Sequence, residues 1–290
     1  MKILLTGKTG QVGWELSRAL APLGELSAHG RAELDVTNPE ELAAAVRRTK
    51  PDVIVNAAAY TAVDRAESEP QIAFAVNAMA LELLAEEARR ADALLIHYST
   101  DYVFDGSKTS PYTEEDQPAP LNVYGQSKLE GENAIRRIGG PHLILRTSWV
   151  YAARGHNFFL TMRRLMNEGR EVRVVSDQIG APTSARALAD ATAELIGRHG
   201  IRGLRGASGI YHATAAGDTS WYGLASEIAR LEGAAAKSWP VPISSAEYPA
   251  RARRPTNSRL SNEKLHRRFH VALPPWQECL AACHAELKPA

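Results

Sequence analysis

The chain has 290 residues, a formal net charge of +1 and a pI near 7.9. Its basic residues are scattered among acidic ones, so we expect no nucleic-acid partner. The N-terminal stretch MKILLTGKTG contains too short an apolar run for a signal peptide, and no apolar stretch reaches the roughly 18 residues of a membrane span. We therefore expect a cytoplasmic protein with no membrane partner.

The first half of the chain alternates short apolar runs with amphipathic helical patterns. This βαβ rhythm predicts an α/β fold with a Rossmann-type, doubly wound parallel sheet. The expected strands are KILLTG, ELSAHG, DVIVNAAAY, ALLIHYSTDY and HLILRTSWVY, and the expected helices cover residues 11–23, 39–49 and 70–91 and a further segment beginning near residue 123.

After residue 151 the alternation becomes irregular. We expect a strand in VRVVSD, a helix over 184–199, a strand in GIYHATA, a helix over 220–232 and a proline-rich loop over 239–260. These patterns predict a NAD(P)-binding domain over residues 1–150, to which a segment near 174–200 returns, and a smaller, mostly substrate-binding region over 151–290. Cys279 and Cys283 lie four residues apart, and this spacing favours buried thiols on a helix over a disulfide.

A glycine-rich turn joins the first expected strand to the first helix. Gly7, Gly10 and Gly13 occur at three-residue spacing in LLTGKTGQVG. Such a turn lets backbone N–H groups approach a pyrophosphate, and the N-terminus of the helix favours its negative charge. The GKT string does not complete the phosphate-binding motif of nucleoside triphosphatases, because Lys2 stands where that motif needs a glycine. The turn therefore predicts a dinucleotide site.

The residues after the second expected strand bear on the choice of dinucleotide. An acidic residue there usually binds a free ribose hydroxyl, but SAHGRAELD places Arg31 close to the strand end, and Lys8 lies in the glycine turn. Either cation could pair with a 2'-phosphate, which favours NADPH. Asp35 follows slightly later and keeps NADH open as the alternative.

Three further residues form a candidate catalytic set. Thr100 ends the strand ALLIHYSTDY, and Tyr124 and Lys128 lie one helical turn apart on the next helix. This set resembles that of the short-chain dehydrogenase/reductase superfamily, which implies reduction of a ketone by a hydride and a proton donor. A phenol with an unperturbed pKa of about 10 exchanges its proton slowly at neutral pH. We expect the Lys128 ammonium to lower the pKa of Tyr124 and Thr100 to donate a hydrogen bond to the substrate oxygen.

The glycine turn, the threonine and the YxxxK motif together resemble the extended branch of the short-chain dehydrogenase/reductase superfamily. Longer strings resemble the dTDP-4-dehydrorhamnose reductase family within it: GKTGQVGWEL, PDVIVNAAAYTAVDRAESEP, HYSTDYVFDG, PLNVYGQSKLEGE, LRTSWVYA, DQIGAPTSA, GIYHATAAGDTSWY and RPTNSRL. The resemblance implies NADPH-dependent reduction of the 4-keto group of dTDP-4-dehydro-L-rhamnose, the last step in making an activated sugar for cell-surface polysaccharide.

The resemblance also implies roles for individual residues. The expected cofactor contacts are Gly7, Gly10, Gln11, Val12, Gly13, Arg31, Asp35, Val36, Ala59, Tyr60, Thr61, Tyr124 and Lys128. The expected substrate contacts are Thr100, Asp101, Tyr124, Trp149 as an apolar wall, and one arginine among Arg253, Arg254 and Arg259, for which we choose Arg254. Asn77 is expected either to bridge backbone groups near the site or to lie at the surface.

Some members of this family bridge a dimer with a metal held by carboxylates. Arg186 stands where one of these carboxylates is expected, although Glu15 is retained, so we expect no metal and leave a homodimer open.

Three alternatives are open at the level of the sequence: a nucleotide-sugar dehydratase, an epimerase and a non-catalytic dinucleotide-binding subunit. A nucleotide-sugar dehydratase is disfavoured because TDY lacks the glutamate that elimination needs, and an epimerase because a serine usually replaces Thr100. A non-catalytic relative serves as a regulatory subunit of methionine adenosyltransferase, and the presence of Thr100, Tyr124 and Lys128 argues against it.

Overall fold

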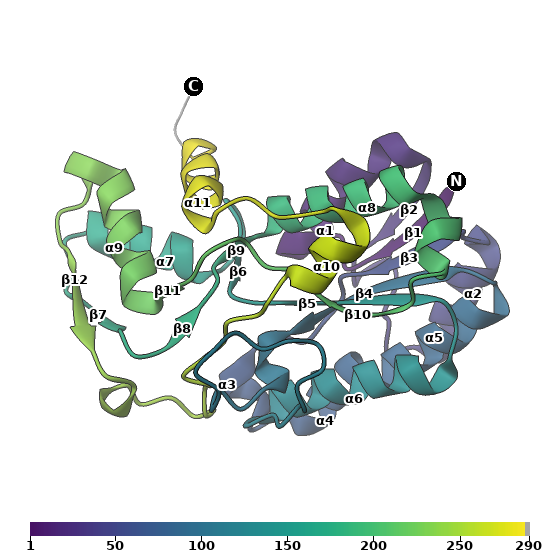
Figure 1. The fold of residues 1–290 in the computed structure, drawn as a ribbon, viewed down its shortest axis with the longest axis horizontal. Helices are drawn as coiled ribbons and strands as arrows, with labels where there is room; N and C mark the ends of the chain where they lie inside the picture. Colours follow the sequence, from purple (N-terminus) through teal and green to yellow (C-terminus); the bar gives the residue numbers. More distant parts are fainter. Residues whose placement is uncertain (288–290) are drawn as a thin grey trace.

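A computed structural model describes residues 1–287 of the chain and has a six-stranded parallel sheet at its centre (Figure 1). The strand order is β10-β5-β4-β3-β1-β2, and every neighbouring pair is parallel. The strands are β1 (Lys2–Thr6), β2 (Glu25–His29), β3 (Val53–Asn56), β4 (Leu94–Thr100), β5 (His142–Thr147) and β10 (Gly209–His212). The predicted Rossmann-type sheet is confirmed.

Helices cover both faces of this sheet. The upper face in Figure 1 carries α1 (Gln11–Leu20), α8 (Ala185–Arg205) and α10 (Glu263–Phe269), and their apolar residues share one core with the sheet. The lower face carries α2 (Pro39–Thr49), α5 (Ala80–Arg90) and α6 (Val123–Ile138), which pack on a second core. The predicted helix over 11–23 ends at Leu20, and a 3-10 turn covers Ala21–Leu23.

The sequence predicted one helix over residues 70–91, but the structure does not form one regular helix there. The segment divides into α4 (Pro70–Phe74), a π-helical turn (Ala75–Met79) and α5. The π-helical turn contains Asn77, whose side chain is fully buried against α6 and the chain after β3. Inserted π-helical turns often place a side chain for a specific contact, and Asn77 is placed in this way.

The second layer lies on the left of Figure 1 and is built from short pieces. Three two-stranded sheets pair β6 (Val150–Tyr151) with β9 (Thr183–Ser184), β7 (Val172–Val175) with β12 (Pro240–Ile243), and β8 (Ile179–Gly180) with β11 (Thr219–Ser220). The helices α7 (Phe158–Asn167), α9 (Trp221–Glu232) and α11 (Trp276–Ala285) enclose a third core with them. A short helix, α3 (Val63–Ala66), follows β3.

The proline-rich segment 239–260 is not entirely loop, which corrects the sequence prediction. Its residues Pro240–Ile243 form β12, parallel to β7. β12 tolerates Pro240 and Pro242 because it is an edge strand that pairs with β7 alone. Proline lacks an N–H group, and on an edge strand that position can face away from the partner.

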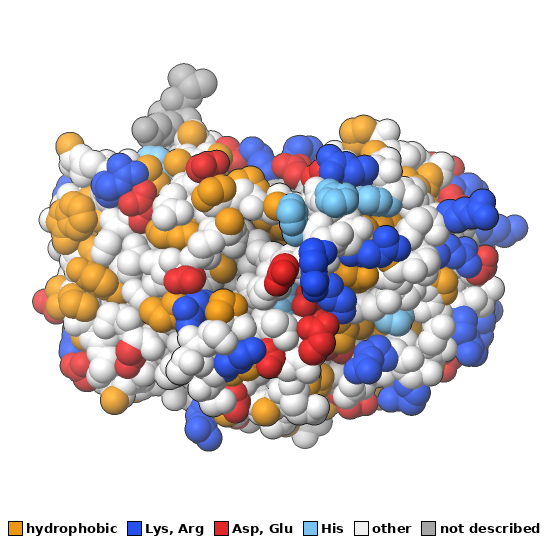
Figure 2. Space-filling view, viewed as in Figure 1, with side chains coloured by type: hydrophobic (Ala, Val, Ile, Leu, Met, Phe, Trp, Pro, Cys, Tyr) orange, Lys and Arg blue, Asp and Glu red, His pale blue; other side chains and the backbone are white. Residues whose placement is uncertain are grey.

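The predicted division near residue 150 stays a prediction. The sheet layer takes in more of the later chain than 174–200, because β10 completes the sheet and α10 packs on it. Cys279 and Cys283 are buried free thiols on α11. Among residues 1–287, no helix is sufficiently long and apolar to traverse a bilayer. Figure 2 shows basic and acidic side chains intermingled over the face it draws.

Candidate active site

A cavity of about 410 Å³ opens at the carboxyl ends of β1, β3, β4 and β5, between the two layers. This is the edge at which open α/β sheets bind their ligands. The cavity brings together ten predicted site residues: Gly10, Gln11, Val12, Ala59, Thr61, Thr100, Asp101, Tyr124, Lys128 and Trp149. The others lie outside its wall, namely Gly7, Gly13, Tyr60, Arg31, Asp35, Val36 and Arg254.

The glycine turn has the geometry of a phosphate cradle. Gly7 has φ = +78°, and a Cβ on Gly13 would lie 2.0 Å from the Gly7 oxygen, so glycine is required at both positions. Helix α1 begins after Gly10 without a side-chain cap, which leaves the first amides free to bind an anion. These features fit the pyrophosphate of a dinucleotide, which would supply the hydride once bound.

The segment after β2 contains an acidic residue that the sequence argument overlooked. Glu33 accepts hydrogen bonds from the Gly30 N–H at 2.7 Å and from the Lys8 ammonium at 2.6 Å. Glu33 therefore joins Asp35 as an acid near this strand end, and it neutralises Lys8. Arg31 is 84% exposed, and its nearest nitrogen is 3.8 Å from the Asp35 carboxylate. Lys8 is thus firmly paired, whereas Arg31 is held loosely.

Thr100 and Asp101 are both buried where β4 ends. The Thr100 hydroxyl donates to Asp101 Oδ1 at 3.0 Å and accepts from the Tyr102 N–H at 3.1 Å. Burial raises the pKa of Asp101 to about 7, against hydrogen bonds from Ser258 and Thr100 that lower it. Near neutral pH this carboxyl group therefore exists in both protonation states.

Tyr124 lies in the first turn of α6, and the Asn122 side chain caps this helix by accepting from the Gly125 N–H at 2.8 Å. A Cβ on Gly125 would lie 2.2 Å from the Tyr102 oxygen, so glycine lets α6 approach the chain after β4. Burial raises the pKa of Tyr124 to about 12, although the neighbouring Thr100 hydroxyl opposes the rise. The expected lowering by Lys128 is not found, because desolvation dominates. The phenol is a proton donor at neutral pH.

Lys128 is 2% exposed and lines the same cavity. Its Nζ donates to the Tyr98 carbonyl at 2.6 Å and lies 3.1 Å from Nε2 of His97. Burial lowers the pKa of Lys128 to about 8, against the charge of Glu132, which raises it. A lysine with this pKa exchanges its proton near neutrality.

Asn77 bridges two elements that border the site, as one of its two expected roles requires. Its side chain accepts from the Tyr60 N–H and donates to the Tyr60 carbonyl, each at 2.9 Å, and also donates to the Ser127 hydroxyl at 3.0 Å. Asn77 thereby links Tyr60, which lies between the predicted cofactor residues Ala59 and Thr61, to α6, the helix that contains Tyr124.

Trp149 forms an aromatic wall together with a residue that the sequence argument missed. Its indole stacks on Trp221 with ring centroids 3.6 Å apart and planes 9° from parallel. The backbone of Trp149 has φ = +48°, and a Cβ on Gly180 would lie 2.5 Å from its ring. The ring is therefore held between Gly180 and Trp221, and the positive φ is the kind of strain found at functional sites.

A second cavity of about 410 Å³ adjoins the first and shares His156, Asn157, Phe158 and Trp221 with it. Arg254 lines this second cavity, where its guanidinium makes two contacts with Asp64, at 2.6 and 3.2 Å. Arg253 is exposed, and the Arg259 guanidinium donates to Asn257 and to the Thr109 carbonyl. Of the three candidate arginines, only Arg254 lines either cavity.

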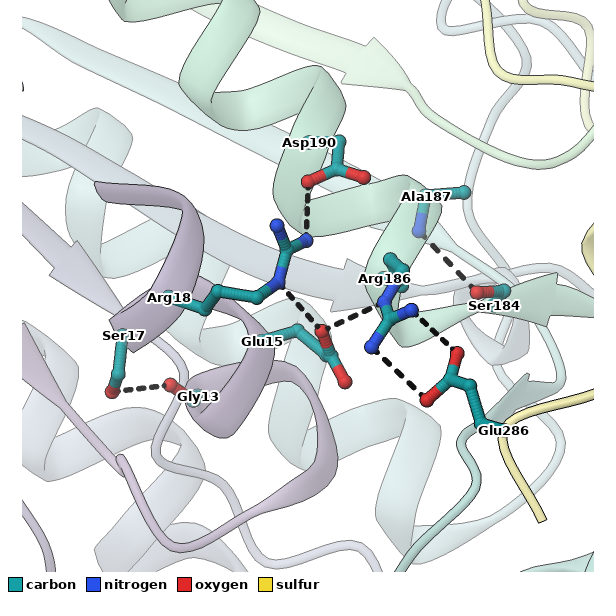
Figure 3. A network of polar contacts seen from close by, with 9 residues as sticks. All are labelled: Gly13, Glu15, Ser17, Arg18, Ser184, Arg186, Ala187, Asp190 and Glu286. Carbon is teal, nitrogen blue, oxygen red and sulfur yellow. Dashed lines mark hydrogen bonds and ion pairs between the residues drawn. The ribbon is translucent and has the colours of Figure 1, made fainter. Parts of the chain in front are cut away.

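Arg186 occupies the centre of an ion-pair network (Figure 3). Its guanidinium lies 3.2 Å from a carboxylate oxygen of Glu15 and 2.7 Å from one of Glu286, and Arg18 joins Glu15 to Asp190. Glu15 is therefore already paired with two arginines, Arg18 and Arg186. Two guanidinium groups at this carboxylate would repel a metal cation. Within residues 1–287, no group of three or more His, Cys, Asp or Glu side chains is placed to hold one.

The sequence argument also missed His97 and Asn157. His97 immediately precedes Tyr98 in the quoted strand, but its contact with Lys128 depends on the packing of α6. Asn157 donates to Gln11 Oε1 at 2.8 Å and so ties the second layer to the glycine turn. No local pattern signals this long-range contact.

Comparisons with known proteins agree with this geometry. The family model "RmlD substrate binding domain" matches residues 1–288. A dTDP-4-dehydrorhamnose reductase of Burkholderia thailandensis is 52% identical over 99% of each chain, and one of Escherichia coli is 51% identical over 96% of this chain and 95% of its own.

Solved structures give the same result. The crystal structure of dTDP-4-dehydrorhamnose reductase from Bacillus anthracis in complex with NADP has a TM-score of 0.91 at 35% identity and covers 99% of this chain and 100% of its own. A Thermus thermophilus UDP-glucose 4-epimerase in complex with NAD is 20% identical with a TM-score of 0.80, over 98% of each chain, and so shares the fold alone. The chain therefore belongs to the dTDP-4-dehydrorhamnose reductase family.

Proposed function

We propose that this protein reduces the 4-keto group of dTDP-4-dehydro-β-L-rhamnose to give dTDP-L-rhamnose, with NADPH as the preferred cofactor and NADH as the alternative. The observation that carries the proposal is the meeting of Thr100, Tyr124 and Lys128 in one cavity next to the glycine turn. The names of the similar reductases and the NADP of the Bacillus anthracis structure support the substrate and the cofactor. The reaction is the last step of dTDP-rhamnose synthesis for cell-surface polysaccharide.

The residues of this chain supply everything except the hydride. Tyr124 donates the proton that the developing alkoxide needs, and its raised pKa keeps it protonated until that moment. Thr100 orients the keto oxygen through its hydroxyl, which Asp101 holds in place. Lys128 provides a positive charge that stabilises the phenolate left on Tyr124 and is the residue we assign to the nicotinamide ribose.

The two adjoining cavities suit the two parts of a nucleotide sugar. We place the sugar ring in the first cavity, against Trp149 and beside Asp101, and the diphosphate near Arg254 in the second. Arg254 is paired with Asp64, whose side chain is 43% exposed and therefore can turn towards solvent when a diphosphate takes its place. The remote nucleotide then helps to orient the reacting carbonyl.

The alternatives are weaker on the same geometry. A dehydratase needs an acid directly after Asp101, but Tyr102 stands there and is buried. A non-catalytic dinucleotide-binding subunit has no need of a buried threonine, tyrosine and lysine that face one cavity. We also propose that the protein is cytoplasmic. A homodimer is one of the assembly states that it could adopt.

The test is to generate the labile keto sugar enzymatically from dTDP-glucose and to add this protein with NADPH. We expect oxidation of NADPH and formation of dTDP-L-rhamnose, identified by mass spectrometry and proton NMR, with little reduction of the unattached sugar. Persistence of the keto sugar while NADPH still binds would favour the regulatory-subunit alternative.

A further inference from the structure

A row of buried polar side chains crosses the sheet towards Lys128. Thr6, Asn56 and His97 are register partners on β1, β3 and β4, and Lys128 of α6 ends the row. None of the four is more than 2% exposed. Neighbouring strand positions on the same sheet face are apolar, and a polar group in such a layer is costly unless each of its donors and acceptors is matched. The matching therefore restricts where the protons of this row can lie.

The backbone fixes the orientation of the Asn56 amide. The Ala58 N–H donates to Asn56 Oδ1 at 3.2 Å, and the Thr6 hydroxyl donates to the same oxygen at 2.5 Å. A backbone N–H can only donate, so the oxygen of the amide has to face it. The amide nitrogen then faces Nδ1 of His97, 2.9 Å away, and donates to it.

This contact determines the tautomer of His97. Burial lowers the pKa of His97 well below its ordinary value, and the charge of Lys128 lowers it further. These two effects outweigh the Asn56 backbone, which raises the pKa, so the ring is neutral. Because Nδ1 accepts from Asn56, the single ring proton is on Nε2. Nε2 lies 3.1 Å from the Nζ of Lys128 and therefore presents a donor to it.

These contacts match the neutral amine of Lys128 better than its ammonium, so they lower the proton affinity of Lys128, although a pKa of about 8 leaves it mostly charged at pH 7. The lone pair of the amine accepts from His97 Nε2–H, while one of its own hydrogens is donated to the Tyr98 carbonyl at 2.6 Å. An ammonium has no lone pair, so it would place a donor against a donor. We propose that Asn56 and His97 are positioning residues that fix the imidazole tautomer and thereby disfavour the ammonium of Lys128 relative to its amine.

The other charges around Lys128 do not produce this effect. Glu132 raises the pKa of Lys128, and it is itself bound by Arg146 through contacts of 2.9 and 2.6 Å. Several other titratable side chains near Lys128 or α6 are neutral at pH 7, shared between two protonation states or paired with an opposite charge: Tyr98, Tyr102, Tyr124, Asp101, Asp64, Arg65, Glu82 and Glu87. Glu67 accepts from the Val123 N–H at the start of α6, and His156 lines the same cavity. Burial lowers the pKa of Lys128, and the donor that His97 presents at 3.1 Å is the further cause that the proposal adds.

Two NMR measurements on the protein without added nucleotide test the proposal. In protein labelled with [13Cε]lysine, the resonance that disappears in Lys128→Met should titrate about two pH units below the other lysines, near pH 8. In protein labelled with 15N in the imidazole rings, His97 should carry its proton on Nε2. An ordinary lysine midpoint, or a proton on Nδ1, would overturn the proposal.

Comparing Asn56→Asp with Asn77→Asp separates the effect of the His97 tautomer on the Lys128 midpoint from the effect of an added negative charge. An aspartate at position 56 can accept from Thr6, from Ala58 and from Nδ1–H of His97, so we expect the ring proton to move to Nδ1 and the Lys128 midpoint to rise by about one pH unit or more. Asn77→Asp is the control, because it also adds an acid beside α6 but makes no contact with His97, whose tautomer should not change. A rise in Asn56→Asp without transfer of the ring proton would contradict the proposal.

The consequence for catalysis rests on the proposed reductase function, whereas the NMR measurements do not. If the Lys128 ammonium supports proton donation by Tyr124, turnover with NADPH should fall as the pH rises through the Lys128 midpoint. In Asn56→Asp this alkaline limit should move upwards by the same interval as the NMR midpoint. An alkaline limit that stays in place while the midpoint moves would show that Lys128 does not set it. Absence of turnover in wild type would refute the reductase function and leave the NMR result intact.

Discussion

The two sides of the active-site cavity are built differently. On the side of β4 and α6, Thr100, Asp101, Tyr124 and Lys128 are buried and are held by short contacts within one layer. On the opposite side, Trp149 and Trp221 are partly exposed and stack on each other. Outside this wall, Arg254 in the adjoining cavity and Arg31 after β2 are held by ion pairs with partly exposed carboxylates, and we call these two arginines the rim. The groups of the first side are buried and already bonded to one another, whereas those of the second side and the rim are exposed enough to exchange their partners.

This difference predicts two kinds of mutational effect. Preorganised groups act on the transition state, so their loss should appear mainly in kcat. Groups that exchange an internal partner for a ligand contribute to binding, so their loss should appear mainly in KM or in cofactor affinity.

The largest effect is expected at the proton donor. Tyr124→Phe removes only a hydroxyl, so folding and NADPH binding should remain close to wild type while turnover falls by a factor of about 10² to 10⁴. Single-turnover absorbance of NADPH, with circular dichroism as the folding control, measures this. Turnover similar to wild type would mean that another group donates the proton.

A large, pH-dependent effect on stability is expected at Asp101. Burial raises its pKa to about 7 in the folded protein, above the ordinary value of about 3.9, so the folded state holds this proton more tightly than the unfolded state. The contribution is favourable below about pH 4 and is lost as the pH rises to 7.

Asp101→Asn keeps the neutral form at every pH. Relative to wild type, the variant should have similar stability at low pH and be more stable at pH 8, by about 2 to 4 kcal/mol for a shift of this size. Urea unfolding at several pH values measures this difference. A difference between the two proteins that does not change with pH would show that Asp101 does not titrate in this range.

The rim should respond through affinity. Arg254→Ala should raise KM for the nucleotide sugar by a factor of about 10 to 150, as expected for losing a charge-assisted contact of about 1.5 to 3 kcal/mol, with a smaller change in kcat. Arg253→Ala is the matched control, because that neighbouring arginine is exposed and lines neither cavity. An equal effect of the two substitutions would remove Arg254 from the site and leave only a general electrostatic attraction.

The same contrast separates what the sequence predicted from what it did not. Most strands and helices of the sheet layer could be predicted because they form local apolar patterns, although α10 was not predicted, and the cavity residues on this side follow directly from the strand ends. The π-helical turn at Asn77 has no such local pattern, because it accommodates a contact between Asn77 and the distant Tyr60 backbone. The β7–β12 pair joins segments 68 residues apart (Val172 with Pro240), and only tertiary packing brings them together.

The site was predicted with the same limits. YxxxK and the preceding threonine identified three residues of one cavity, but Trp221 lies 72 residues beyond Trp149 in the chain, and their stacking depends on how α9 packs. The pKa of Tyr124 was predicted in the wrong direction. A sequence shows that a lysine lies one turn away but does not show how deeply the phenol is buried.

The smallest effect is expected where the rim meets the cofactor. Lys8 is held 2.6 Å from Glu33, whereas Arg31 is 84% exposed and 3.8 Å from Asp35, so Arg31 is the cation that can turn to a 2'-phosphate without breaking a close pair. Arg31→Ala should therefore weaken NADPH binding by about 1 kcal/mol, a small effect because water screens an exposed charge. NADH binding should be nearly unchanged, because NADH has no 2'-phosphate. Lys8→Ala should have less effect on the ratio of the two affinities. Isothermal titration with both cofactors measures the ratio, and a larger change for Lys8→Ala would show that the lysine leaves Glu33 to bind the phosphate.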